Sequence, residues 1–145
     1  MVKSMNRKLL SMMIIVLASS IGCGVKPDEV SGGDAERHHA KPLALNKADG
    51  DSVNYAEGDR TDWKVVELQD TGSMKIEVIL DNPNANVVTS LYDRYGKAIT
   101  RTTHRKGDGA LMTMASDVGL GKYFIMVQAE GRPDKTGYTI KAVIK

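Results

Sequence analysis

The chain ends in two runs of alternating apolar and polar residues, at positions 123–129 and 137–144. A period of two residues predicts β-strands that each have one buried face and one solvated face. The residues expected on the buried faces are Tyr123, Ile125, Val127, Ala129, Tyr138, Ile140, Ala142 and Ile144. Glycine, proline and aspartate lie between the runs and favour a turn. The pattern therefore predicts the two closing strands of a β-sandwich.

The same pattern recurs upstream, where short alternating runs are separated by residues that favour turns. The predicted strands cover positions 52–56, 62–68, 73–81, 86–93, 98–103, 110–116, 123–129 and 137–144. In the third run Met74, Ile76, Val78 and Leu80 share one side, while the charged residues between them share the other. The sequence therefore predicts an all-β sandwich of about eight strands over residues 47–145.

Two of the later strands also carry large apolar side chains on the face opposite the predicted core. These residues are Phe124, Met126, Met112 and Met114. If their faces are exposed, they form an apolar patch suited to a protein partner, because methionine adapts to different surfaces. If the sandwich buries them, they are ordinary core residues. A slip of one residue exchanges the two faces, so the sequence leaves both possibilities open.

The N-terminal 22 residues have the three parts of a bacterial export signal. Basic residues at positions 3, 7 and 8 precede an apolar run at 9–17, and small residues then lead to Cys23. The run is too short to cross a bilayer comfortably, since about 20 apolar residues are needed. We therefore expect residues 1–22 to be a signal peptide.

The sequence Ser20-Ile21-Gly22-Cys23 resembles the lipobox of bacterial lipoproteins. This resemblance implies that Cys23 is lipidated on sulfur and becomes the first residue of the mature chain. Gly24, rather than aspartate, implies sorting to the outer membrane, with the domain at the periplasmic side or the surface. The alternative is that Cys23 is a small apolar residue of an ordinary signal or an uncleaved anchor.

Residues 23–46 contain proline, glycine and mixed charge without a usable period, which predicts a flexible tether that carries the lipidated cysteine. His38 and His39 lie in this segment. Two adjacent side chains in a mobile segment cannot close the four-ligand shell of a zinc site, so we expect them to be solvated.

The charge balance excludes one class of partner. The whole chain has a formal net charge of +2, and it becomes −1 without the three basic residues of the export signal. A nucleic-acid-binding protein needs a clustered basic face, so no nucleic-acid partner is expected. The single cysteine cannot form an internal disulfide, so an exported domain must rely on its core for stability.

Residue spacing gives no support for catalysis. The three histidines, His38, His39 and His104, cannot be placed against a nucleophile or a carboxylate by their spacing. The sequence contains no phosphate-binding glycine loop, no HExxH and no cysteine pair for zinc or redox chemistry. We therefore predict a protein that is not an enzyme and has no organic cofactor.

A local density of carboxylates offers a weak calcium site. The candidate ligands are Asp49, Asp51, Asp59 and Asp62, with Glu57 nearby. Calcium takes six to eight oxygen ligands, but EF-hand spacing is absent, and turns of β-proteins are rich in aspartate for backbone reasons. The alternative is that Asp59 and Asp62 hold the turn before Trp63.

A basic run is the second candidate site and offers a surface for anionic headgroups, glycans or an acidic protein. It consists of Arg94, Lys97, Arg101, Arg105 and Lys106, with His104 among them. The alternative is a solvated hairpin whose charges protect a sheet edge against aggregation.

The order of several short motifs resembles that of the bacterial pre-peptidase C-terminal domain. The motifs are Gly58-Asp59, Asp62-Trp63, the strands at 74–80 and 87–92, Asp93 with Gly96, the segment 121–127 and Gly137-Tyr138-Thr139-Ile140. The resemblance implies a jelly-roll-like antiparallel sandwich of a kind appended to exported proteins, some of which bind calcium, polysaccharide or collagen. Lys64 stands where the family usually has an aromatic residue.

Together these features predict a lipid-anchored, non-catalytic binding or scaffolding module of the cell envelope. The expected partners are the membrane, through the lipid, and another envelope protein or assembly. The alternatives are carbohydrate- or calcium-dependent ligand binding, and an accessory role beside an exported protease.

Overall fold

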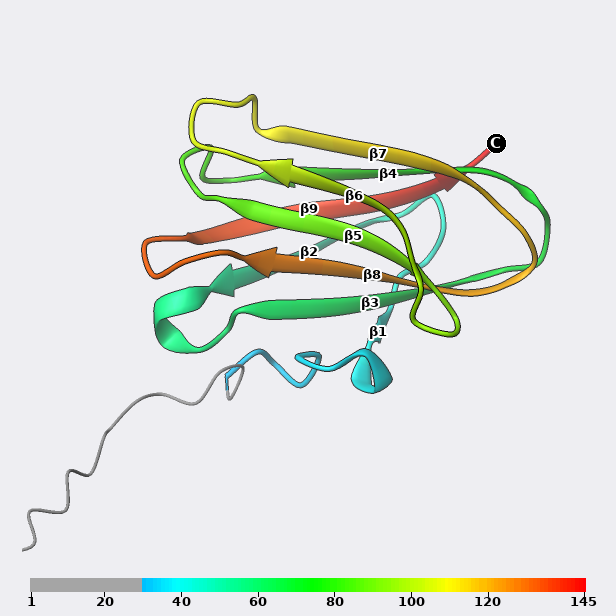
Figure 1. Cartoon of the computed structure of the whole chain (residues 1–145), viewed down its shortest axis with the longest axis horizontal. Helices are drawn as coiled ribbons and strands as arrows, with labels where there is room; N and C mark the ends of the chain where they lie inside the picture. Colours follow the sequence, from blue (N-terminus) through cyan, green and yellow to red (C-terminus); the bar gives the residue numbers. More distant parts are fainter. Residues whose placement is uncertain (1–29) are drawn as a thin grey trace, which may run out of the picture.

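The computed structural model describes residues 30–145, and two β-sheets pack face to face in it (Figure 1). The strands are β1 (Lys41–Pro42), β2 (Ala48–Asn54), β3 (Thr61–Leu68), β4 (Gly72–Leu80), β5 (Val87–Asp93), β6 (Ala98–His104), β7 (Leu111–Val118), β8 (Gly121–Ala129) and β9 (Lys135–Ile144). Two 3₁₀ turns, η1 (Arg37–His39) and η2 (Tyr55–Glu57), lie before β1 and after β2. None of the helices within residues 30–145 is long and apolar enough to cross a membrane.

The five-stranded sheet has the order β1-β3-β8-β5-β6, and the four-stranded sheet has the order β2-β9-β4-β7. All pairs between these strands are antiparallel except β1 with β3, which is parallel. The predicted all-β sandwich is confirmed. The sequence pattern did not predict β1, because a strand of two residues that contains Pro42 is too short to show a period.

The core lies between the two sheets and is built from the predicted alternating residues. Ile125, Val127 and Ile140 are fully buried there, as are the alternate residues of β4. Met112 and Met114 also belong to this core, because β7 pairs with β4 in a register that sets them opposite Val78 and Ile76. The sequence left open whether these two side chains are exposed or buried, and the pairing with β4 places both in the core.

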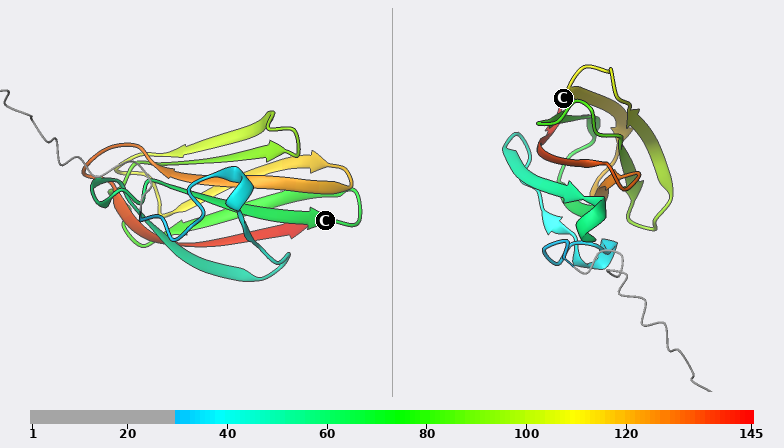
Figure 2. Two further views of the ribbon diagram at one scale, coloured as in Figure 1. Left: turned by 90° about the horizontal axis from the view of Figure 1, so that it is seen from below. Right: turned by 90° about the vertical axis from the view of Figure 1, so that its left-hand side faces the viewer.

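Part of the predicted tether is an ordered piece of the sandwich, which we call the N-terminal strap (residues 31–43). Asp34 and Leu43 are buried within it. The Trp63 amide donates a hydrogen bond to the Asp34 carbonyl (2.9 Å), and the Leu43 amide donates one to the Val65 carbonyl (2.8 Å). The strap therefore follows β3, and η1 contacts that strand (Figure 2). The prediction of a flexible tether is wrong for these residues, because long-range contacts order a segment that has no local period.

The predicted signal peptide and Cys23 lie outside the described residues, as do the first residues of the predicted tether.

Candidate functional site

The outer face of the five-stranded sheet carries large apolar side chains where a solvated face would usually be polar. Trp63 on β3 pairs in register with Met126 on β8, and Val65 pairs with Phe124. Tyr92 on β5 is the cross-strand neighbour of Phe124. All five side chains are half-buried. The sequence alone leaves open whether Phe124 and Met126 are exposed or buried, and the register places both on this outer face.

The aromatic rings on this face contact one another. The Trp63 and Tyr92 rings have centroids 5.2 Å apart and planes tilted by 48°. This is a favourable geometry for an aromatic pair. Because the planes are tilted, the two rings do not form one flat platform on which a sugar ring could stack.

The outer face of the four-stranded sheet is more polar. Its central positions hold Lys75 and Glu77 on β4, and Glu77 pairs in register with Lys141 on β9. Ile79 and Leu111 form an exposed apolar pair near one end. Among the described residues, the outer face of the five-stranded sheet therefore carries the larger group of aromatic and apolar side chains, which are half-buried, and the other sheet carries the exposed pair.

The predicted basic residues are all exposed and lie in β6, the edge strand of the five-stranded sheet, and in the turns at its two ends. Arg94 and Lys97 lie in the turn before β6, and Arg105 and Lys106 lie in the loop after it. Arg101 is in the middle of the strand, and it pairs with Ser90 on the apolar face. The run therefore borders the apolar face, and its position on an edge strand also fits the alternative role of protecting that edge.

One acidic residue offsets part of this charge. Glu130 forms an ion pair with Arg105 and lies 4.0 Å from the Arg101 guanidinium. His104 is not part of the basic surface, because its ring is buried and its Nδ1 lies 2.8 Å from the Ala85 carbonyl oxygen.

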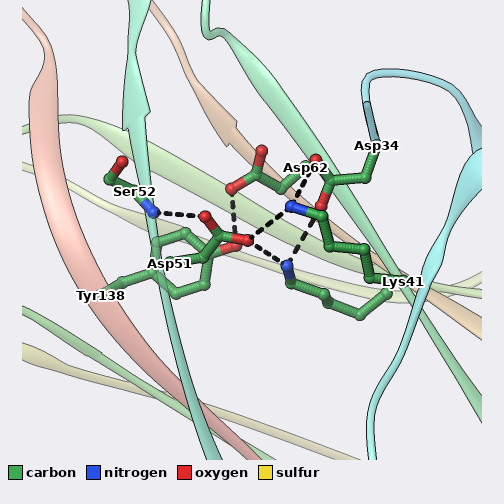
Figure 3. Close-up of polar contacts among 7 residues, drawn as sticks. Asp34, Lys41, Asp51, Ser52, Asp62 and Tyr138 are labelled. Carbon is green, nitrogen blue, oxygen red and sulfur yellow. Dashed lines mark hydrogen bonds and ion pairs between the residues drawn. The ribbon is translucent and has the colours of Figure 1, made fainter. Parts of the chain in front are cut away.

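A second group of polar residues, which we call the charged cluster, lies where the strap meets both sheets. Its members are Asp34, Lys41, Asp51, Asp62, Lys64 and Tyr138 (Figure 3). The Lys64 ammonium lies 3.1 Å from Asp34 Oδ2 and also pairs with Asp51 Oδ2. Lys41 Nζ lies 3.2 Å from Asp34 Oδ1 and 3.4 Å from Asp51 Oδ2. Two carboxylates and two ammonium groups thus neutralise one another.

Asp62 is the third carboxyl group of the charged cluster, and unlike the other two it has no cationic partner there. The Tyr138 hydroxyl donates a hydrogen bond of 2.7 Å to Asp62 Oδ2. Burial raises the pKa of Asp62 to about 8, and the nearby carboxylates of Asp34, Asp51 and Asp59 add to the shift. Asp62 is therefore mainly a neutral carboxylic acid at pH 7. Burial, together with Asp62, also raises the pKa of Tyr138 far above its ordinary range, so its hydroxyl keeps its proton.

The pKa of Asp51 is lowered, in contrast to that of Asp62. Burial alone would raise its pKa, but the hydrogen bond and the charge of Lys64 outweigh burial and hold this pKa below its usual range. Asp51 is therefore ionised and holds Lys64 in place.

The structure brings together only two of the four predicted calcium ligands. Carboxylate oxygens of Asp51 and Asp62 lie within 4.8 Å of each other and of Asp34, whereas Asp49 and Asp59 lie outside this group. The backbone of Asp59 pairs with Asn54 beside η2, as expected for a turn residue. Two ammonium groups already balance the ionised carboxylates, so the charged cluster is suited to joining the strap to the sheets rather than to binding calcium.

The sequence contained one signal of this cluster. Asp62, Lys64, Val66 and Leu68 share the inward face of β3, so two ionisable groups occupy positions where the alternation predicts core residues. A buried ammonium requires partners. The partners in the strap were missed because Asp34 is 30 positions away from Lys64.

Arg37 holds η1 against the apolar face, and its removal is expected to loosen the strap. Its guanidinium lies 5.3 Å from the centre of the Phe124 ring. Arg37→Ala should lower the free energy of unfolding by about 0.5–2 kcal/mol and speed amide hydrogen exchange in residues 35–40, since it removes this cation–π contact. Arg94→Ala is the matched control, because it removes a cation–π contact of the same kind from the exposed Tyr95 ring, while the contacts of Arg37 with Phe124 and Gly96 stay in place. Equal exchange in both variants would contradict this role.

Comparison with solved structures supports the fold. The pre-peptidase C-terminal domain of a collagenase from Bacillus anthracis is similar to this chain with a TM-score of 0.60 and 16% identity, over 71% of this chain and 93% of that one. PliG, a periplasmic inhibitor of g-type lysozyme from Aeromonas hydrophila, has a TM-score of 0.53 and 15% identity, over 73% of this chain and 96% of that one. No protein-family model and no curated protein matches the sequence. The predicted resemblance to the pre-peptidase C-terminal domain is confirmed for the fold.

Proposed function

We propose that this protein is a non-catalytic binding module of the bacterial cell envelope, anchored by lipid at Cys23. The outer face of the five-stranded sheet binds an acidic surface of another envelope protein. The observation that carries this proposal is the half-buried apolar group on that face, bordered by the exposed Arg101.

The composition of this face supports protein binding. Tryptophan, tyrosine, methionine and arginine are enriched in protein interfaces, and hot spots favour tryptophan, tyrosine and arginine. Trp63, Tyr92 and Met126 supply the apolar centre, while Arg101 and Lys97 supply charge at its border. A partner with acidic residues around an apolar patch is complementary to this arrangement.

The non-catalytic role is supported by how the ionisable groups are used. His104 faces a backbone carbonyl, and the carboxylates and ammonium groups of the charged cluster pair with one another. Both arrangements satisfy buried polar groups instead of activating a nucleophile.

Lipid at Cys23 adds a physical advantage to a weak contact. A domain confined to a membrane surface meets a membrane-bound partner at a high effective concentration. Several acyl chains make such attachment stable, whereas one chain gives only marginal binding.

The test is an affinity pull-down of the full-length protein from detergent-solubilised membranes, with co-purifying proteins identified by mass spectrometry. We expect a defined envelope protein with the native chain and at least about tenfold less of it with Arg101→Glu, because reversing a charge at an interface opposes binding. Lys141→Glu, which changes an outward-facing lysine on the other sheet, is the matched control and should recover the partner normally. Cys23→Ala should deplete the membrane-bound complex.

Two outcomes would contradict the proposal. Equal recovery with Arg101→Glu and the native chain would exclude this face as the binding surface. Retention on immobilised glycan with no protein partner would replace the proposal with the carbohydrate-binding alternative.

A further inference from the structure

We propose that Glu36, His38 and His39 form a surface site for a divalent transition-metal ion of the kind that imidazole prefers, such as Zn²⁺ or Cu²⁺. Each of the three residues offers one ligand atom, and these atoms lie within 4.8 Å of one another. All three side chains are exposed, so an ion can reach them from solvent. This site is separate from the charged cluster and does not depend on the proposed binding of a protein partner.

The backbone of η1 places the ligands on one side. The His39 amide donates a hydrogen bond of 2.9 Å to the Glu36 carbonyl, and this bond closes the turn. Glu36 is the N-cap of η1, and its extended backbone leads into the turn beside His38 and His39. The His38 ring centroid is 3.9 Å from that of His39.

The turn is also held in place by contacts that no local sequence pattern indicates. Arg37, between the ligands in sequence, points the other way and packs over Phe124 and against Gly96. Asp34 is fixed by its ion pairs just before the turn, and β1 pairs with β3 just after it. The two histidines therefore lie in a fixed turn and have Glu36 as a third ligand. A mobile segment and the lack of a third ligand were the two reasons for expecting no metal site here.

The distances suit a small ion with few protein ligands. His38 Nδ1 lies 3.1 Å from Glu36 Oε2. Two ligands of a tetrahedral zinc ion at ~2.0 Å are separated by about 3.3 Å, so this pair is already near the required spacing. An ion between these atoms would replace the ion pair of His38 with Glu36, and a modest rotation of His39 would bring in the third ligand. The fourth position would remain open to water or to a group from another molecule.

The test uses the full-length chain in detergent with Cys23→Ser, which removes the sole thiol as a competing ligand. We expect calorimetric titration with ZnCl₂ or CuCl₂ to show one strong site per chain. We also expect the electron paramagnetic resonance spectrum of the Cu²⁺ form to show coupling to two imidazole nitrogens. His38→Gln and His39→Gln should each weaken binding by at least roughly 10- to 100-fold, because loss of even an outer-shell partner of a ligand has an effect of this size.

Glu57→Gln is the matched control, since Glu57 is an exposed glutamate in a second 3₁₀ turn, η2. It should bind metal like the background protein, whereas Glu36→Gln should bind more weakly. The buried His104 already contacts a backbone carbonyl and does not compete. Unchanged affinity in both histidine variants, or a Cu²⁺ spectrum without nitrogen coupling, would overturn the proposal. Unfolding midpoints of all variants should match, because the substituted side chains are exposed.

Discussion

Lys64→Met is expected to lower the free energy of unfolding by about 3–5 kcal/mol, because it removes one partner of a buried ion pair. The Lys64 side chain is fully buried, and its ammonium pairs with Asp34 and Asp51. Methionine fills a similar volume but leaves the fully buried Asp34 with only Lys41 as its cationic partner in the charged cluster. The loss is measured by urea unfolding at pH 7.

The matched control for this substitution is Lys75→Met, because Lys75 also pairs with a carboxylate, that of Glu77. That pair lies on the outer face of the four-stranded sheet, where solvent screens it, so we expect little change in stability. A loss of stability in Lys64→Met no larger than that in Lys75→Met would show that the charged cluster does not hold the strap.

As the pH rises from 5 to 8, the free energy of unfolding of Asp62→Asn is expected to increase relative to that of the native protein. Burial raises the pKa of Asp62 to about 8 in the folded state, whereas an unfolded chain has the ordinary value near 3.8. Between these two values the folded state binds a proton that the unfolded state has released. The stability that this proton contributes therefore falls by up to about 1.4 kcal/mol for each pH unit.

Asparagine resembles the neutral carboxylic acid and does not titrate, so the variant should lack this slope. The measurement is urea unfolding of both proteins at pH 5, 6, 7 and 8, because subtraction cancels the groups that they share. We expect the variant to gain on the order of 3 kcal/mol relative to the native protein across this range. Asp81→Asn is the control, since Asp81 lies in the exposed turn after β4. A constant difference between Asp62→Asn and the native protein would contradict the raised pKa.

The sandwich could be predicted because the alternation of apolar and polar residues within each strand shows which side chains are buried. Ile76 and Ile140 alternate with polar neighbours, and that period is visible without any knowledge of the partner strand. The same rule was insufficient for Met112 and Met114, because β7 has apolar residues on both faces and only its pairing with β4 fixes the register.

The strap and the charged cluster could not be predicted from local patterns. Asp34 is ordered by Lys64, a residue on a different element, and no period in the strap reports that contact. The single local signal was the inward position of Asp62 and Lys64 on β3. The grouping of Glu36 with His38 and His39 was hidden for a similar reason, because these side chains come together only once the backbone turns at η1.

The position of the strap also bears on mechanics. A pulling force that enters the domain at residue 30 passes through Asp34 and its ion pairs before it reaches β2. It next meets β1, whose parallel pairing with β3 carries the strap into the sheet. A force applied at residue 30 therefore acts first on the charged cluster and on the pairing of β1 with β3. The hydrophobic core between the sheets bears it only after these contacts have broken.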